Sequence, residues 1–344
     1  MKTLFEVQEG GEMEVSRREF VFGGVAVATG LAAGCRTAGT GGFDENLTVF
    51  LSDIHVVADD PVYATAFAHT RRELENRIAE ILAMRPLPRH VVTFGDLCFN
   101  HGEMSSYDFV KPLFDRLEAA GIRVVHGMGN HDRRQTFLSA YPEYARTTKV
   151  PGRIVSVVDL GTADLVLLDS LKGKDGEVVP GSGGPVEGEL DEAQQKWLEE
   201  TLPGWKRPVF VGAHHPAGEL SVCGRRMVTF LKECPNVMGW LCGHDHVWRK
   251  ECLVGWWADN EDSIRSLTLP SAGLWGDIGY VTFRTERDCA VAELHQSGYW
   301  FNNGPRPGEQ IPELWKEVVA ENRGQYCKFP YERPRRPRWN KEDK

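Results

Sequence analysis

The segment IRVVHGMGNHD, residues 122–132, joins an apolar stretch to an amide, an imidazole and a carboxylate in its last three positions. The apolar residues predict a buried strand, and Gly129 marks the turn at which that strand ends. Asn130, His131 and Asp132 carry the kinds of group that bind metal ions or transfer protons. One such cluster proves little, and its significance depends on whether it recurs along the chain.

Four other apolar segments end in clusters of the same kind. These are Asp53-Ile54-His55, Gly95-Asp96, His214-His215 and Gly243-His244-Asp245-His246. Helices predicted over 66–84 and 105–120 separate the strands predicted over 47–52, 90–94 and 122–126, and this alternation indicates βαβ units with parallel strands. The carboxyl ends of parallel strands meet at one edge of a sheet, so the clusters are expected to lie together.

The second half of the chain repeats this pattern and completes an α/β fold. Two helix starts carry capping signatures, Ser105-x-x-Asp108 and Asp191-x-x-Gln194. Strands are predicted over 153–158, 164–168, 208–213 and 236–242. Four further strands, over 247–253, 264–269, 279–284 and 290–295, are expected to form the far side of a second sheet.

The strand ends supply seven candidate metal ligands. They are Asp53, His55, Asp96, Asn130, His214, His244 and His246. Oxygen and imidazole donors suit Mn, Fe or Zn ions rather than a thiolate site. Seven donors are too many for one zinc ion but suit two ions held ~3.5–4 Å apart by a bridging carboxylate, for which Asp96 is best placed. Such a pair lowers the pKa of a shared water from 15.7 towards ~7, which is the machinery for hydrolysing a phosphate ester.

In this order, the motifs resemble those of the calcineurin-like metallophosphoesterase family between Asp53 and His246. The resemblance implies two packed mixed β-sheets flanked by helices, a four-layer αββα sandwich. It also implies two divalent or trivalent metal ions and an attack on phosphorus by a metal-activated hydroxide. The first ion would be held by Asp53, His55 and His246 and the second by Asn130, His214 and His244, with Asp96 bridging.

The same resemblance assigns proton transfer to His131, which would contact the phosphate and protonate the leaving oxygen while Asp132 orients it. Phe99 departs from the family pattern, because it stands where relatives carry Asp or Tyr and it cannot coordinate a metal. The metallo-β-lactamase motif His-x-His-x-Asp-His is absent, since Val247 and Trp248 follow His246.

Several functional questions remain open at this level. The substrate is either a phosphodiester or a phosphomonoester, and the alternative to an enzyme is a catalytically inactive surface binding protein on the same fold. Asn100, His101 and Glu103 follow the second motif, where either a substrate contact or an exposed loop explains them. Arg249 and Lys250 could contact phosphate, but an exposed strand face explains them equally well.

The net charge of −9 gives no overall attraction for nucleic acid, so none is expected as a partner except as a substrate. An anionic substrate must be attracted locally, and bound cations could do so. No Cys-x-x-Cys pair is present, so the sequence indicates neither a zinc ribbon nor a thioredoxin motif.

The N-terminus carries a predicted export signal over residues 1–34. Arg17-Arg18 resembles a twin-arginine signal, an apolar run of 14 residues follows from Phe20, and Cys35 ends a lipobox-like segment that would carry a lipid anchor. Acidic residues before the arginines suggest that translation starts at Met13. Passage through the twin-arginine export machinery would place the protein in the periplasm or cell envelope.

The remaining boundaries follow from composition. Residues 35–46 are predicted to be a flexible tether, 47–300 the metallophosphoesterase domain, and 301–344 a Pro/Arg-rich extension with one helix over 312–321.

Overall fold

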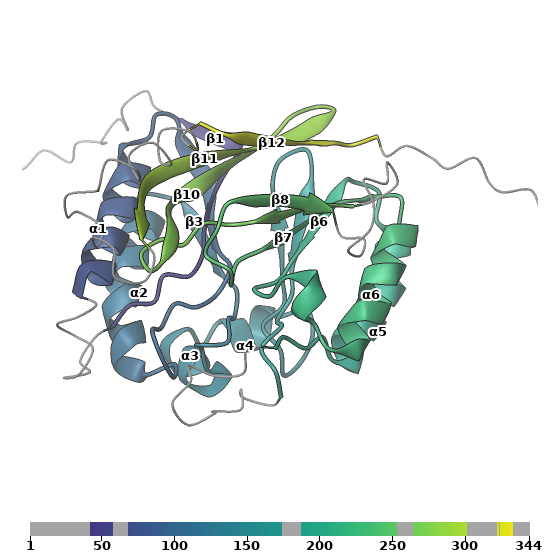
Figure 1. The fold of residues 1–344 in the computed structure, drawn as a ribbon, viewed down its shortest axis with the longest axis horizontal. Helices are drawn as coiled ribbons and strands as arrows, with labels where there is room; N and C mark the ends of the chain where they lie inside the picture. The colour runs from purple at the N-terminus through teal and green to yellow at the C-terminus, as the bar shows by residue number, and fades with distance from the viewer. Residues whose placement is uncertain are drawn as a thin grey trace, which may run out of the picture. The chain divides into compact units, whose positions relative to one another are not determined.

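The computed structural model describes residues 42–57, 68–173, 187–252, 264–300, 322 and 324–332 (Figure 1). All the elements below belong to the unit Gly41–Lys344. The predicted export signal and the helix expected over 312–321 lie outside the described residues. Within the described part of the chain, no helix has both the length and the apolar character needed to cross a membrane.

The first sheet has six strands in the order β12-β11-β10-β1-β2-β3. Their bounds are β1 Phe43–Leu51, β2 Leu87–Thr93, β3 Arg123–His126, β10 Gly276–Thr285, β11 Cys289–Trp300 and β12 Tyr326–Pro330. β1, β2 and β3 are parallel, which confirms the predicted βαβ units. β10, β11 and β12 continue the sheet beyond β1 in antiparallel pairs.

The second sheet also has six strands, in the order β4-β5-β6-β7-β9-β8. Their bounds are β4 Ser156–Asp159, β5 Asp164–Leu167, β6 Val209–Gly212, β7 Val237–Cys242, β8 Arg249–Cys252 and β9 Arg265–Thr268. The four inner strands are parallel, and β4 and β8 are antiparallel edges. Both sheets are therefore mixed, as predicted.

Helices cover the outer face of each sheet (Figure 1). Their bounds are α1 Ala68–Ala83, α2 Met104–Ala119, α3 Arg134–Ala140, α4 Tyr144–Thr147, α5 Glu192–Thr201 and α6 Val222–Glu233, with short 3-10 turns η1 Leu202–Gly204 and η2 Ala217–Glu219. The capping prediction at Asp191 is confirmed, because its side chain accepts a hydrogen bond from the Gln194 backbone N–H.

The alternation of side chains along β1 shows how the layers form. Val49 and Leu51 belong to the apolar cluster that contains residues of α1 and α2. Phe50, between them in sequence, faces the other way, and its ring centroid is 4.9 Å from that of Phe283. The ring of Phe283 is in turn 4.9 Å from that of Phe210 in the second sheet. A third cluster joins the second sheet to α5 and α6. The four-layer αββα sandwich is therefore confirmed.

The assignment of the late strands to the second sheet is partly wrong. β8 and β9 do join that sheet, but β10 pairs with β1 and β11 with β10 in the first sheet. In the pairing of β1 with β10, Thr48 lies opposite Phe283. The side chain of Phe283 belongs to the apolar cluster between the sheets. Strand pattern alone does not identify a strand's partner, because the pairing depends on residues more than 200 positions away.

Three local predictions also need correction. Residues 43–46, predicted as tether, are part of β1, and residues 326–330 of the predicted extension form the edge strand β12. The capping box at Ser105 is wrong, because α2 begins at Met104 and has Glu103 as its N-cap residue, without a side-chain cap. The first turn is held instead by Ser106, whose Oγ donates to the Val56 carbonyl at 3.0 Å.

Candidate metal centre

The seven candidate ligands lie at the carboxyl ends of five strands that come from both sheets. Asp53 and His55 follow β1, Asp96 follows β2, and Asn130 follows β3. His214 follows β6, and His244 and His246 follow β7. The edges of two sheets thus contribute to one site, as expected where parallel strands end.

The first group of donors consists of Asp53, His55 and His246, whose ligand atoms all lie within 4.8 Å of one another. The Nε2 atoms of His55 and His246 are 3.2 Å apart, and Asp53 Oδ1 lies 3.2 Å from His246 Nε2. Two imidazole nitrogens approach this closely only across a shared proton or a cation. This geometry fits a metal ion.

The second group consists of Asn130, His214 and His244. Asn130 Oδ1 lies 3.0 Å from His214 Nε2 and 2.9 Å from His244 Nδ1, and these two nitrogens are 3.2 Å apart. The group therefore presents one oxygen and two nitrogen donors toward a single point. Such a set suits Mn, Fe or Zn.

One oxygen of Asp96 lies between the two groups. Its Oδ2 is 3.5 Å from His55 Nε2 and 3.1 Å from His214 Nε2. Its Oδ1 accepts the backbone N–H of His131 at 2.8 Å, which fixes the orientation of the carboxylate. Asp96 is thus the carboxylate placed to serve both donor groups.

Strained backbone is concentrated at this site. In the described part of the chain, six non-glycine residues have positive φ, and five are candidate ligands: Asp53, His55, Asp96, His244 and His246. The sixth, Trp275, has its ring 6.2 Å from that of His246. Each such conformation costs of order 1–3 kcal/mol. The fold therefore holds these ligand orientations at a cost in the free energy of unfolding.

The motif glycines permit this close packing. A Cβ on Gly129 would lie 2.1 Å from Asp96 Oδ1, and a Cβ on Gly243 would lie 1.9 Å from Ser52 Oγ and 2.7 Å from Asp53 Oδ2. A side chain at either position would therefore displace a ligand.

Backbone carbonyls orient two of the histidines. His214 Nδ1 lies 2.8 Å from the Phe94 carbonyl, and His246 Nδ1 contacts the Leu274 carbonyl. A ring that donates from Nδ1 keeps the lone pair of Nε2 free for a metal. His244 is reversed: its Nδ1 faces the second group, and its Nε2 lies 3.1 Å from the Glu219 carboxylate. Glu219 belongs to no sequence motif. The η2 turn brings it to His244 in the folded chain, so the sequence alone did not identify it.

Burial and close charges shift the ionisation of these groups in opposite directions. Burial alone would raise the pKa of Asp96, but His214 and His131 hold it well below its usual range. Burial would lower the pKa of His214, yet the Asp96 carboxylate raises it to about 9. Burial lowers the pKa of His55 to about 3, despite the attraction of Asp96. An anionic Asp96 and a neutral His55 are the forms that bind a cation.

His131 lies beside the first donor group, and one of its ring nitrogens is within 4.8 Å of ligand atoms of His55 and Asp96. Its ring centroid is 4.7 Å from that of His55, and its Nδ1 is buried with no hydrogen-bond partner among the described residues. Burial lowers its pKa, although Asp96 acts in the opposite direction. The ring is therefore held at the centre with one nitrogen available for a ligand.

Asp132 does not orient His131, contrary to what the family resemblance implies. Its carboxylate accepts hydrogen bonds from the Gly129 and Leu97 backbone N–H groups at 3.0 and 3.2 Å and from the Tyr107 hydroxyl at 3.0 Å. Burial raises its pKa to about 6, although these donors oppose the shift. Asp132 thus ties together the two loops that carry Asp96 and Asn130, a role that depends on the distant Tyr107.

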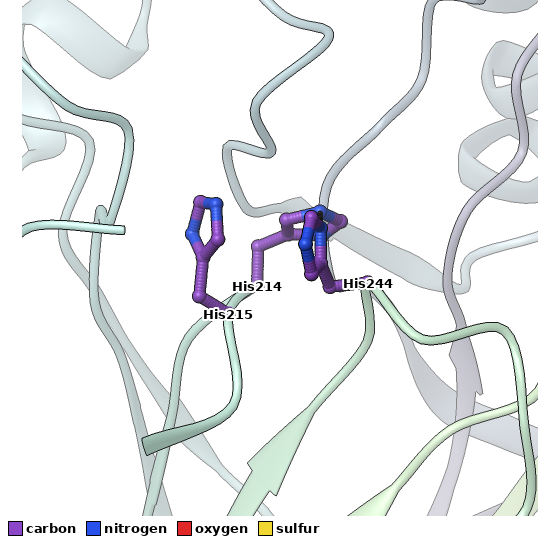
Figure 2. Close-up of side chains that lie close together, drawn as sticks. All are labelled: His214, His215 and His244. Carbon is purple, nitrogen blue, oxygen red and sulfur yellow. Dashed lines mark hydrogen bonds between the residues drawn. The ribbon is translucent and has the colours of Figure 1, made fainter. Parts of the chain in front are cut away.

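His215 lies near His214 and His244 of the second group (Figure 2). Its Nδ1 is 2.8 Å from Ser170 Oγ, and its ring centroid is 4.8 Å from that of His244. The ring therefore lies beside the second group, with a ring nitrogen within 4.8 Å of ligand atoms of His214 and His244. His126, by contrast, packs 4.7 Å from both Phe114 and Tyr141 and is a core residue.

Two consecutive arginines, Arg133 and Arg134, follow the Gly-Asn-His-Asp motif and are buried. Arg134 forms a side-on ion pair with Asp169, with Nε to Oδ2 at 2.6 Å and Nη2 to Oδ1 at 2.8 Å. This pair connects the start of α3 to the end of β5. Neither arginine is marked by a ligand motif, and the sequence prediction assigned them no role.

Comparisons with known proteins agree with this geometry. A family model described as calcineurin-like phosphoesterase matches residues 47–248. A probable cyclic nucleotide phosphodiesterase of Rhodopseudomonas palustris is 32% identical over 293 residues, which cover 83% of this chain and 93% of that protein. A probable cyclic nucleotide phosphodiesterase of Rhodococcus erythropolis is 30% identical over 159 residues, covering 46% of this chain and 48% of that protein.

A similar fold occurs in a crystal structure of a dimetal phosphatase from Danio rerio. The TM-score is 0.53 at 16% identity, and the match covers 73% of this chain and 96% of that one. At this identity the likeness concerns the fold alone.

Proposed function

The chain belongs to the calcineurin-like phosphoesterase family, and we propose that it uses two metal ions to hydrolyse phosphodiesters, with cyclic nucleotides as the first substrates to test. The observation that carries the two-metal proposal is the position of Asp96 Oδ2 between His55 Nε2 and His214 Nε2. Phosphoesterase activity follows from the family, whereas the diester preference and the substrate are proposals.

The proposed ligands divide into two sets that share Asp96. Asp53, His55 and His246 would hold one ion, and Asn130, His214 and His244 the other. When bound, the two cations would supply Lewis acidity to the phosphoryl group and a water of lowered pKa. Two carboxylates leave two divalent cations with a net positive charge, so an anionic phosphate would be attracted locally despite the chain's net charge of −9.

His131 is the proposed general acid. The hydrogen bond from its backbone N–H to Asp96 Oδ1 fixes its position relative to the proposed bridging carboxylate, and its Nδ1 has no partner among the described residues. A phosphate bound nearby would favour its protonated form, from which a proton can pass to the leaving oxygen. Asp132 supports this geometry through the loops rather than through the imidazole.

The diester preference rests on the two bacterial relatives, both named as probable cyclic nucleotide phosphodiesterases. A phosphomonoesterase would use the same donors, so the donor set alone does not favour one substrate class. A catalytically inactive surface binding protein is disfavoured, because all seven donors are present and converge.

We also propose that residues 1–34 direct export through the twin-arginine machinery to the periplasm or cell envelope, with acylation at Cys35. The sequence pattern supports this proposal. Mass spectrometry of the N-terminal peptide from a cell-envelope fraction would test it. An unmodified peptide that begins at Met1 or Met13 would contradict both cleavage and acylation.

Comparing substrates with leaving groups of different basicity tests the chemistry. The Mn²⁺-loaded protein should hydrolyse bis-p-nitrophenyl phosphate and 3′,5′-cyclic AMP faster than p-nitrophenyl phosphate. His131→Ala should retain both metals and lose about 10²–10⁴-fold in kcat on cyclic AMP. The loss should be smaller on the nitrophenyl esters, because nitrophenolate leaves readily without a proton.

The matched control is His295→Gln, which removes a histidine that stacks on Tyr280 at 4.7 Å and takes no part in the proposed centre. This variant should retain wild-type turnover. Equal losses for His131→Ala on all three substrates would contradict its role as general acid. Two bound metals without turnover of any ester would instead favour the binding protein.

A further inference from the structure

Arg133 is a buried arginine beside the second donor group. The residue is only 6% exposed. One end of the guanidinium is anchored, because Nη1 donates to the Asn130 carbonyl at 3.0 Å and to the Asp132 carbonyl at 2.6 Å. These contacts hold the group against the loop that carries Asn130 and His131.

The other edge of the same guanidinium has no partner. Nε and Nη2 of Arg133 are buried, and neither has a hydrogen-bond partner within the described ranges. In that part of the chain no carboxylate forms an ion pair with Arg133, whereas the same edge of Arg134 is filled by Asp169. Burying a cation without an anion is costly, so an unpaired guanidinium edge that is held in place indicates a group whose counter-ion is supplied by a ligand.

The empty edge has the geometry of an oxyanion receptor. Nε and Nη2 of an arginine present two parallel N–H donors, which match two oxygens of a phosphate or a carboxylate. Arg134 and Asp169 show this pairing in the same molecule, at 2.6 and 2.8 Å. Because Nη1 is already fixed, little side-chain entropy remains to be lost when the anion binds.

The loop after β2 contacts Arg133. A Cβ on Gly102 would lie 2.6 Å from the Arg133 backbone nitrogen and 2.8 Å from its Cγ, so the loop and the arginine are in direct contact. His101 in this loop and His131 on the other side each have a buried Nδ1 without a partner in the described residues. Arg133 thus contacts both the loop after β2 and the loop that carries Asn130, and each of these loops carries a histidine whose buried Nδ1 has no partner among the described residues.

We propose that the Nε–Nη2 edge of Arg133 forms an oxyanion subsite that binds the phosphoryl oxygens of the substrate next to the two metal ions. The subsite rests on the proposed function for the identity of its ligand. Because Gly102 contacts Arg133, a phosphate on this edge would lie near the loop after β2, which favours a substrate contact for His101 over an exposed loop. Arg133 would contribute to binding, and a phosphate product would occupy the same edge.

Phosphate binding tests the subsite independently of turnover. Isothermal titration of the Mn²⁺-loaded chain with inorganic phosphate should show an affinity about 10- to 100-fold lower for Arg133→Met than for the wild type. Arg133→Lys should recover only part of that affinity, because lysine keeps the charge and loses the two-pronged geometry. In the hydrolysis assay KM for bis-p-nitrophenyl phosphate should rise by a similar factor.

Arg249→Met is the matched control. Arg249 follows the Gly-His-x-His motif, but its Nη2 is paired with the Asp245 carboxylate. This variant removes the same charge near the centre and should bind phosphate as the wild type does. An equal loss in both variants would show a general charge effect and overturn the subsite.

The remaining outcomes are also decisive. Wild-type phosphate affinity in Arg133→Met, compared at equal metal content, would overturn the subsite. If Arg133→Met does not fold, unchanged affinity in Arg133→Lys would overturn it equally well. If the wild type hydrolyses no ester but binds phosphate in an Arg133-dependent way, the proposed function fails and the subsite stands.

Discussion

The loops at the strand ends and the core between the two sheets are built on the same strands but differ in almost every physical respect. Phe50 lies in the extended strand β1. Its side chain is surrounded by apolar residues and packs against Phe283. Three residues later, Asp53 is equally buried, charged and held at a φ of +51°.

The apolar core therefore stabilises the fold, and the loops at the strand ends are held in their conformations by that fold. Apolar burial between the sheets contributes favourable free energy, whereas buried carboxylates and strained φ values at the loops oppose folding. Substitutions in the loops should therefore change metal binding and turnover, and substitutions in the core should change the free energy of unfolding. Three variants test this division.

The largest effect is expected at Asp96, the carboxylate shared by both donor groups. Asp96→Asn removes the charge that would neutralise two cations, so turnover should fall by about 10⁴-fold, equivalent to several kcal/mol. Metal analysis should find fewer than two ions per chain, and added Mn²⁺ should no longer raise the melting temperature as it does in the wild type.

The control is Asp164→Asn. Asp164 is the first residue of β5, at the end of the strand that points away from the candidate metal centre. Asp164 is also buried, where it accepts the Trp205 indole N–H at 2.7 Å. Its replacement should lower stability without changing metal content. Full metal occupancy in Asp96→Asn would show that the carboxylate does not bridge.

A core substitution should give the reverse pattern. Phe283 is completely buried and contacts Phe50 and Phe210 from both sheets. Phe283→Ala should lower the free energy of unfolding by about 3–5 kcal/mol, while kcat/KM of the folded fraction at low temperature stays close to wild type. Phe283→Leu is the milder control. A large loss of turnover in a fully folded Phe283→Ala protein would break the proposed division.

The smallest effect concerns His126, a titratable group within the core. Burial lowers its pKa to about 3, and its Nδ1 lies 3.0 Å from Thr93 Oγ1. Above pH ~6.5 both folded and unfolded states hold it neutral, and below that pH only the unfolded state takes up the proton. Its contribution to stability is therefore lost as pH falls from ~6.5 towards 3, by up to about 1.4 kcal/mol per pH unit.

His126→Phe should remove this dependence. Urea unfolding between pH 7.5 and pH 4, with chelator present so that metal release does not contribute, should show a shallower decline for the variant than for the wild type. Parallel pH profiles for the two proteins would contradict the assigned cause. At pH 7.5, where His126 is neutral in both states, the remaining difference in stability between the two proteins reports the other effects of the substitution, including the loss of the Thr93 contact.

Much of the fold follows from local pattern. The apolar runs before Asp53 and Asp96 are strands because continuous apolar segments of this length suit a strand buried on both faces, and the run before Asn130 forms the edge strand β3. Glycine and proline mark the ends of helices, as at Gly121, which has a φ of +89° after α2. The seven candidate donors could be named in advance because each stands at the end of such a run, where parallel strands bring side chains together.

Other features exist only in the folded chain, because they depend on contacts between distant residues. The pairing of β10 with β1 spans more than 200 positions and cannot be read from either strand alone. Asp132 meets Tyr107 rather than His131, and Glu219 meets His244, because packing decides the direction of each side chain. Sequence determined which donors this protein carries and the order in which strands deliver them. Tertiary structure placed Asp96, the carboxylate that the sequence predicted to bridge, between donors from the two sheets. It also decided which of two consecutive arginines is paired, because Asp169 reaches Arg134 and not Arg133.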